Sequence, residues 1–214
     1  MEKENLIIAI CGGSASGKTT LANDFAKSTE RAVTIIREDD YNLDHASNPE
    51  FDSSEHNFDH IDSRDSVLLA KHMSLLKRGK TIDYPEYCFK THSRLGARKV
   101  SATDVIIVEG MHILFHENIR VSVDFSVFID VPDDIRLSRR IIRDRSERNR
   151  SCEVLIRQYL RNIRPMHHKF VQPSKRFADL SIDYSFEHEQ ADANDRAGRP
   201  SHELIKALEE RGLW

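Results

Sequence analysis

The residues at positions 12–19 have types and spacing suited to binding a phosphate group. They match the pattern G-x-x-x-x-G-K-[ST] in full, with an apolar run at 6–11 before them and a helical pattern at 18–28 after them. Glycines let the backbone curl so that successive N–H groups face one anion, and the N-terminal end of the following helix adds positive charge. The alternative is a glycine turn that merely precedes a helix. We predict a phosphate-binding loop made of Gly12, Gly13, Ser14, Ala15, Ser16, Gly17, Lys18, Thr19 and Thr20.

A carboxylate at the end of a second apolar run adds to this phosphate chemistry. Residues 105–108 are apolar and lead directly into Glu109, the layout known as Walker B. In proteins with such a loop, a carboxylate at the carboxyl end of a neighbouring strand faces the Mg²⁺ of the nucleotide. We therefore expect Lys18 to reach the β- and γ-phosphates, and Thr19 and Glu109 to hold Mg²⁺. Taken alone, an apolar run ending in Glu could equally be a strand that reaches the surface.

A dense group of arginines occupies residues 136–150, where seven of the fifteen residues are Arg. Arg136, Arg140 and Arg143 fall on one stripe of a helix, so their guanidinium groups could converge on the oxygens of a transferring phosphoryl group. We expect a lid that closes over the nucleotide and excludes water. A salt-bridged surface remains the alternative, because acidic residues lie among the arginines.

The elements that must position these residues alternate along the chain. Five apolar runs of strand length lie between helical patterns, which is typical of a parallel sheet with helices on both faces. The predicted strands are 6–11, 33–37, 105–108, 125–131 and 180–184. The predicted helices are 18–28, 63–78, 133–145, 151–164 (ended by Pro165) and 201–211 (ended by Gly212). We therefore predict an α/β fold, a P-loop NTPase-type parallel sheet flanked by helices, in one domain spanning residues 1–214.

Two segments differ from this alternation. Residues 38–62 are acidic, aromatic and rich in histidine, whereas residues 187–199 contain almost no large apolar side chains. We predict a mobile loop for the second segment, within a C-terminal loop and helix at 185–214. Residues 136–164 would form the lid.

Composition narrows the class of protein. The net charge of −3 and a pI near 6.4 argue against a nucleic-acid partner. No apolar run is long enough to span a membrane, and the N-terminus lacks the layout of a signal peptide. Three cysteines with no paired spacing argue against disulfides. We expect a cytoplasmic protein without a membrane or nucleic-acid partner.

His112 and His116 have the spacing of a zinc pair, but no third ligand accompanies them.

Several further motifs lie in order along the chain: Asn57-Phe58-Asp59-His60, the stretch from Pro85 to Arg94, and the arginine-rich residues 136–150. After them come Gln158-Tyr159, Arg164-Pro165-Met166 and residues 173–180. In types and order these motifs resemble those of the uridine kinase (uridine-cytidine kinase) family of P-loop kinases, and the resemblance covers about residues 7–182. The resemblance implies phosphorylation of the 5′-hydroxyl of uridine or cytidine by ATP or GTP with Mg²⁺. It also implies a homo-oligomer, commonly a tetramer.

The resemblance assigns roles to individual residues of this chain. Asp39 would accept the proton of the 5′-hydroxyl, Asp59 would bind the ribose hydroxyls, and residues 38–98 would form the nucleoside-binding lobe. The remaining expected contacts to the nucleoside are Tyr87 and His92 at the base, Phe58 and Phe89 as aromatic walls, and Arg140, Arg150 and Gln158. Arg143 and Arg148 would face the phosphates of ATP and, with Asp39 and Lys18, act in catalysis.

Some positions depart from the family pattern and keep alternatives open. Asn42 stands where a second aromatic is usual, Ile61 replaces proline, and residues 183–188 replace a glycine-containing loop. A related kinase of nicotinamide riboside, pantothenate or ribulose phosphate is one alternative, and a non-catalytic nucleotide-binding regulator is another. Tyr87 and Phe89 could instead line a core face of one strand. One of the adjacent Asp39 and Asp40 could simply cap a turn.

Overall fold

A five-stranded parallel sheet forms the centre of the protein, as the sequence predicts. The computed structural model describes residues 4–45, 48–52, 55–148, 151–183 and 193–214. The strand order is β2-β5-β1-β6-β7, and every neighbouring pair is parallel. Near-continuous apolar sequence suits such strands because both faces of the sheet are covered. The strands are β1 (Leu6–Gly12), β2 (Val33–Arg37), β5 (Val105–Gly110), β6 (Phe125–Asp130) and β7 (Leu180–Asp183).

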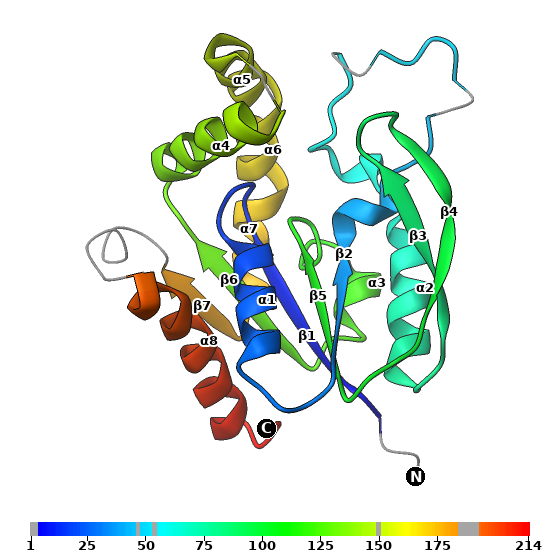
Figure 1. Ribbon diagram of the computed structural model, residues 1–214, viewed down its shortest axis with the longest axis vertical. Coiled ribbons are helices and arrows are strands. Elements are labelled where there is room, and N and C mark those ends of the chain that lie inside the picture. The colour runs from blue at the N-terminus through cyan, green and yellow to red at the C-terminus, as the bar shows by residue number, and fades with distance from the viewer. Residues whose placement is uncertain (1–3, 46–47, 53–54, 149–150, 184–192) are drawn as a thin grey trace.

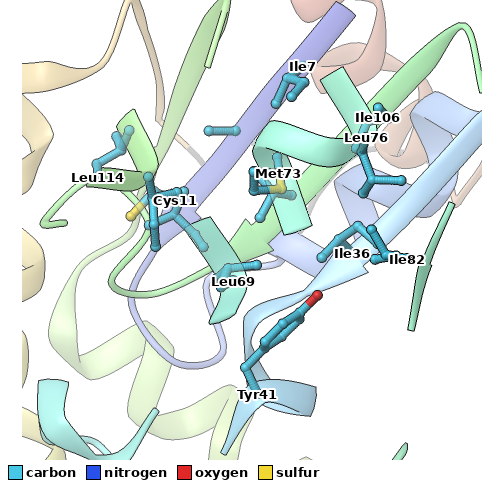
Figure 2. Packing of buried hydrophobic residues seen from close by; sticks show 14 of the residues in the cluster. Ile7, Cys11, Ile36, Tyr41, Leu69, Met73, Leu76, Ile82, Ile106 and Leu114 are labelled. Atoms are coloured by element: carbon cyan, nitrogen blue, oxygen red, sulfur yellow. The ribbon is translucent and has the colours of Figure 1, made fainter. Parts of the chain in front are cut away.

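Each face of the sheet packs against its own hydrophobic core. Successive side chains of β1 point to opposite faces and so contribute to the two cores in turn. Ile8 and Ile10 face α1 (Lys18–Lys27) and α8 (Ala193–Glu210), whose Leu21, Phe25, Leu204 and Leu208 are buried there. Ile7 and Cys11 face the opposite side, packed with side chains of α2 (Ser66–Lys77) and α3 (Glu117–Arg120). Figure 2 shows Leu69, Met73 and Leu76 of α2 in this second core. Packing on both faces fixes the parallel strands, so their carboxyl ends lie together at one edge of the sheet.

A β-hairpin that the sequence analysis does not predict lies beside α2 (Figure 1). It pairs β3 (Ile82–Cys88) and β4 (Ser93–Val100) antiparallel, with a register shift between Glu86 and Tyr87. Ile82 and Tyr84 of β3 are buried while Asp83 and Glu86 are exposed, so the strand has the in-and-out pattern of a sheet covered on one face. The hairpin supplies much of the expected nucleoside-binding lobe.

The helices in the segment predicted to be a lid run further than predicted. α4 (Asp133–Arg148) and α5 (Cys152–Gln158) lead into further helical turns, α6 (Arg164–Met166) and α7 (Gln172–Ser174). The prediction that Pro165 ends a helix is therefore wrong. A π-helical turn, Tyr159–Ile163, directly precedes α6, and the segment stays helical through Pro165, which has no N–H to donate. In Figure 1, α4 and α5 stand on one side of the strands' carboxyl ends and the hairpin on the other.

Two helix starts also differ from the predictions. The helix predicted at 63–78 begins at Ser66, because Asp65 caps it by accepting the N–H of Leu68. Helix α8 begins at Ala193, so residues 193–199 are helical and not the predicted loop, while 187–192 lie outside the described residues. No helix within the described part of the chain is long and apolar enough to cross a membrane.

Candidate active site

The phosphate-binding loop joins the carboxyl end of β1 to the start of α1. Ala15 and Gly17 take positive φ angles of 63° and 100°, which turn the backbone back on itself. At Gly13 an added Cβ would lie 2.5 Å from Arg136 Nη1, and at Gly12 it would lie 2.6 Å from the carbonyl oxygen of Ile129. Both glycines are therefore required by close packing, and the loop lies directly in front of the N-terminus of α1.

Lys18, Thr19 and Glu109 meet at this loop, as predicted from two separate motifs. The Thr19 hydroxyl donates to Glu109 Oε1 at 2.8 Å, and Lys18 Nζ donates to the carbonyl oxygen of Gly13 at 2.9 Å. Glu109 is the last residue but one of β5 and is only 6% exposed. Burial raises the pKa of its carboxyl group, while Lys18 opposes that rise.

This pair of oxygen ligands fits Mg²⁺. A hard cation prefers carboxylate and hydroxyl oxygens and usually keeps several waters and substrate phosphates as its other ligands. A cation would also offset the burial of the Glu109 carboxylate. Within the described residues no group of three or more His, Cys, Asp or Glu side chains that could hold a metal ion is found.

Asp39 faces the same cleft from the carboxyl end of β2. It lies on the 3₁₀ turn Glu38–Tyr41, and its side chain is 56% exposed. The cleft has a volume of about 780 Å³ and also receives Lys18, Thr19 and Glu109. Arg64 Nη2 donates to Asp39 Oδ1 at 2.7 Å. Desolvation favours a higher pKa for Asp39, but the charge and hydrogen bond of Arg64, together with the charges of Lys18 and Arg143, outweigh it and hold that pKa below its ordinary value.

The neighbouring Asp40 is tied to the hairpin. Its carboxylate accepts a hydrogen bond from the Tyr84 hydroxyl, and that hydroxyl in turn accepts the N–H of Arg37 at 3.1 Å. Burial raises the pKa of Asp40. Asp40 therefore joins β2 to β3, while the Asp39 carboxylate is the one held by a buried arginine at the cleft.

The expected nucleoside contacts form a second group beside the cleft. Phe58 and His92 stack with ring centroids 4.6 Å apart, and the rings of Tyr87 and Phe89 meet edge to face at 5.1 Å. Phe89 is 53% exposed and lines the cleft just beyond β3, so it does not share a core face with Tyr87. Asp59 is 7% exposed, and burial raises its pKa against the opposing charges of Arg140 and Arg64.

Sequence reasoning missed part of this aromatic group. The rings of His45 and Phe51 stack with centroids 4.0 Å apart, and the ring centroid of His56 lies 4.6 Å from that of Phe58. His45, Phe51 and His56 all belong to the histidine-rich segment 38–62, which differs from the rest of the chain in composition. Arg64 was also missed. The only signal for it is a single arginine a few residues after the Asn57-Phe58-Asp59-His60 motif.

The arginines of α4 do not act as one stripe. Arg136 is 1% exposed and lies behind the loop against Gly13, so the expectation that it converges on phosphate oxygens is wrong. Arg140 Nη1 donates to Ser14 Oγ at 2.7 Å, and Arg143 Nε donates to the buried Asp144 at 2.8 Å. Arg143 lines the cleft together with Arg139, which the site prediction omits. Helix α4 thus combines salt-bridged and cleft-facing arginines.

Several predicted residues do not line the cleft itself or lie outside the described residues. Gln158 is half-buried at the end of α5. Among the described residues that line the cleft, Phe58, Asp59, Tyr87 and His92 do not appear, nor does Gln158. Arg150 and the side chain of Arg148 lie outside the described residues.

Comparison with known proteins agrees with the phosphate-binding geometry of the cleft. Residues 7–191 match the model of the "Phosphoribulokinase / Uridine kinase family". A uridine kinase of Brevibacillus brevis is 41% identical over 83% of this chain and 84% of its own length. Uridine-cytidine kinase A of Dictyostelium discoideum is 40% identical over 84% of this chain and 36% of its own length. The solved phosphoribulokinase of Rhodobacter spheroides, 13% identical, superposes with a TM-score of 0.62 over 85% of this chain and 71% of its own, which shows a shared fold.

Proposed function

The chain belongs to the phosphoribulokinase and uridine kinase family, and we propose that it transfers the γ-phosphoryl group of ATP or GTP to the 5′-hydroxyl of uridine or cytidine. The observation that carries the proposal is the placement of Asp39 in one cleft with Lys18, Thr19 and Glu109. A loop that only holds a nucleotide needs no carboxylate at the acceptor side of its phosphates. The 39–41% identity to proteins named uridine kinase supports the nucleoside as acceptor.

The proposed reaction is an in-line displacement. The 5′-oxygen of the nucleoside forms a bond to the γ-phosphorus as the bond from that phosphorus to the bridging oxygen breaks, and the nucleoside diphosphate leaves. Asp39 accepts the proton of the hydroxyl, and its lowered pKa keeps it ionised and ready to do so. Mg²⁺ held by Thr19 and Glu109 would neutralise charge on the phosphates. Most of the rate would come from positioning and charge stabilisation.

The lid would supply further positive charge. Arg139 and Arg143 line the cleft, and Asp144, which is fully buried, holds Arg143 in place. We propose that these guanidinium groups contact the phosphate oxygens of the donor, that Arg148 does the same, and that Arg150 contacts the nucleoside. Removing such a group in phosphoryl-transfer enzymes costs several orders of magnitude in turnover, on the order of 10³ or more.

The nucleoside would lie between the hairpin and the segment that carries Asp59. A buried carboxylate suits the donor hydroxyls of a ribose, and the exposed ring of Phe89 suits stacking on a flat base. Tyr87 and His92 would contact the base, with Phe58 behind it. Arg140 and Gln158 complete the proposed contacts, although Arg140 already bonds to Ser14 of the loop.

The test is ADP release that depends on Mg²⁺, measured with uridine, cytidine, adenosine, nicotinamide riboside, pantothenate and ribulose 5-phosphate as acceptors. We expect turnover of uridine and cytidine, and its loss in Asp39→Asn with ATP binding retained. Turnover of another acceptor would keep the kinase and discard the pyrimidine nucleoside. ATP binding without turnover of any acceptor would favour the nucleotide-binding regulator.

The donor, assembly and compartment are proposals of the same kind. We propose ATP or GTP as donor, a cytoplasmic location, and a homo-oligomer, commonly a tetramer in the family. Competition between ATP and GTP in the same assay decides the donor, and light scattering of the purified protein decides the number of subunits.

A further inference from the structure

Arg64 is a buried cation that joins the two halves of the proposed acceptor site. It is 8% exposed and lies between the 3₁₀ turn Ile61–Ser63 and helix α2. Its Nη2 donates to Asp39 Oδ1 at 2.7 Å, and its Nη1 donates to the carbonyl oxygen of Phe58 at 2.8 Å. One rigid guanidinium plane thus touches both the proposed base and the residue directly before Asp59.

The surroundings of Arg64 explain why a charged group is stable there. Its Nε lies 3.9 Å from Glu38 Oε2, and Glu38 is itself 1% exposed and accepts the N–H of His112 at 3.0 Å. Burial opposes the charged form of Arg64, but Asp39, Glu38 and Asp59 outweigh it and raise its pKa above the ordinary value. A planar, permanently charged fork holds several acceptors in one fixed geometry, whereas the ammonium of a lysine is a compact point charge with rotatable donors.

We propose that Arg64 is the positioning residue of the acceptor site, which fixes the Asp39 carboxylate and the Asp59 segment relative to each other. This inference rests on the proposed function. With Arg64 in place, one guanidinium group is hydrogen-bonded both to the carboxylate proposed for the 5′-hydroxyl and to the backbone directly before Asp59. Loss of Arg64 would let both move, while the phosphate-binding loop, held by β1 and α1, would stay in place.

The charge of Arg64 also sets how strong a base Asp39 is. The groups that act on Asp39 are the cations Arg64, Lys18 and Arg143 and the carboxyl groups of Glu38, Asp40, Asp59 and Glu109. Arg64 provides the largest lowering contribution to the pKa of Asp39. Because Asp39 must be ionised to accept a proton, removing the Arg64 charge moves the acid limb of the activity profile to higher pH.

Three variants separate positioning from stability. Arg64→Met removes the charge and both hydrogen bonds while keeping an unbranched side chain, and Arg64→Lys keeps the charge without the fork. The matched control is Arg94→Met. Arg94 also binds backbone carbonyls of this lobe, those of Tyr41 and Asn42 at 3.1 Å each, and pairs with Asp65, but no hydrogen bond joins it to Asp39.

In Arg64→Met we expect kcat to fall about 100-fold, the typical cost of a misplaced reacting group. We expect the KM for the nucleoside to rise about tenfold, as when a charged hydrogen bond is lost, and the KM for ATP to stay within about twofold of wild type. The acid limb of kcat/KM moves to higher pH in Arg64→Met but not in Arg64→Lys. Arg64→Lys recovers part of kcat, and Arg94→Met loses thermal stability without moving the limb.

Two results would overturn the role of Arg64. One is an Arg64→Met protein that is destabilised like Arg94→Met but keeps the wild-type kcat, nucleoside KM and acid limb. The other is an equal loss in the KM for ATP, which would show general misfolding. Wild-type protein is measured in the same assay. If it phosphorylates no nucleoside, the proposed function fails, and this inference fails with it. If wild-type protein turns over the nucleoside and Arg64→Met keeps the same kcat, nucleoside KM and acid limb, the role of Arg64 is refuted while the proposed function stands.

Discussion

Replacing Gly13 with alanine would place a methyl group against a buried arginine. A Cβ at Gly13 would lie 2.5 Å from Arg136 Nη1 and 2.8 Å from Arg136 Cζ. The guanidinium cannot move aside freely, because Arg136 is 1% exposed and its Nε donates to the carbonyl oxygen of Val131 at 3.0 Å. Either that charge-assisted hydrogen bond breaks, at a cost of about 1.5–3 kcal/mol, or the loop moves away from its phosphate-binding geometry.

For Gly13→Ala we therefore expect a loss of about 2 kcal/mol in the free energy of unfolding, which for this chain length is about 4–8 °C in Tm. A displaced loop would weaken ATP binding about tenfold, or about 1.4 kcal/mol. Scanning fluorimetry gives the Tm and calorimetric titration with Mg-ATP gives the affinity. Gly79→Ala is the control, since Gly79 has a φ of +72° and no atom within 4 Å of its added Cβ. That control loses stability through strain but keeps ATP binding. Wild-type Tm and affinity in Gly13→Ala would refute the close packing of loop and arginine.

Three further predictions follow from the cleft. Glu109→Gln removes a buried charge whose pKa is raised by burial, so we expect a higher Tm together with roughly a tenfold greater Mg²⁺ requirement for turnover, measured by magnesium titration. Phe89→Ala removes an exposed ring at the cleft, so the KM for the nucleoside should rise about tenfold while the Tm is unchanged; an unchanged KM would place the base elsewhere. Because Arg64, Lys18 and Arg143 together outweigh desolvation and hold the pKa of Asp39 below its ordinary value, kcat/KM should show no acid limb from Asp39 between about pH 5 and 8. A limb in that range that arises from Asp39 would contradict the ion pair.

The parallel sheet and its phosphate chemistry were predictable because they are local in the sequence. The apolar runs of β1, β2 and β5 begin at the expected residues, and the strands end at the groups that line the cleft. A glycine-rich loop after one strand and a glutamate after another need only the rule that parallel strands share a carboxyl edge. Register and packing then bring Thr19 to Glu109.

Features that depend on distant contacts were not predictable in this way. β4 is largely polar and exposed, so its residues give no apolar alternation, and only pairing with β3 makes it a strand. Pro165 stands in a helical segment because a π-helical turn precedes it, which no propensity reveals. Arg64 and Asp39 are 25 residues apart, and only the fold shows that they form an ion pair.

The measurement that tests the account most directly is the identity of the product formed from Mg-ATP and uridine by wild-type protein and by Asp39→Asn. Phosphorus NMR of the mixture distinguishes a 5′-monoester from inorganic phosphate. We predict uridine 5′-monophosphate with wild type, and no product with Asp39→Asn although that variant still binds ATP. Inorganic phosphate alone from wild type, or equal amounts of the 5′-monophosphate from both proteins, would contradict the assignment of the cleft as a nucleoside kinase site with Asp39 as its base.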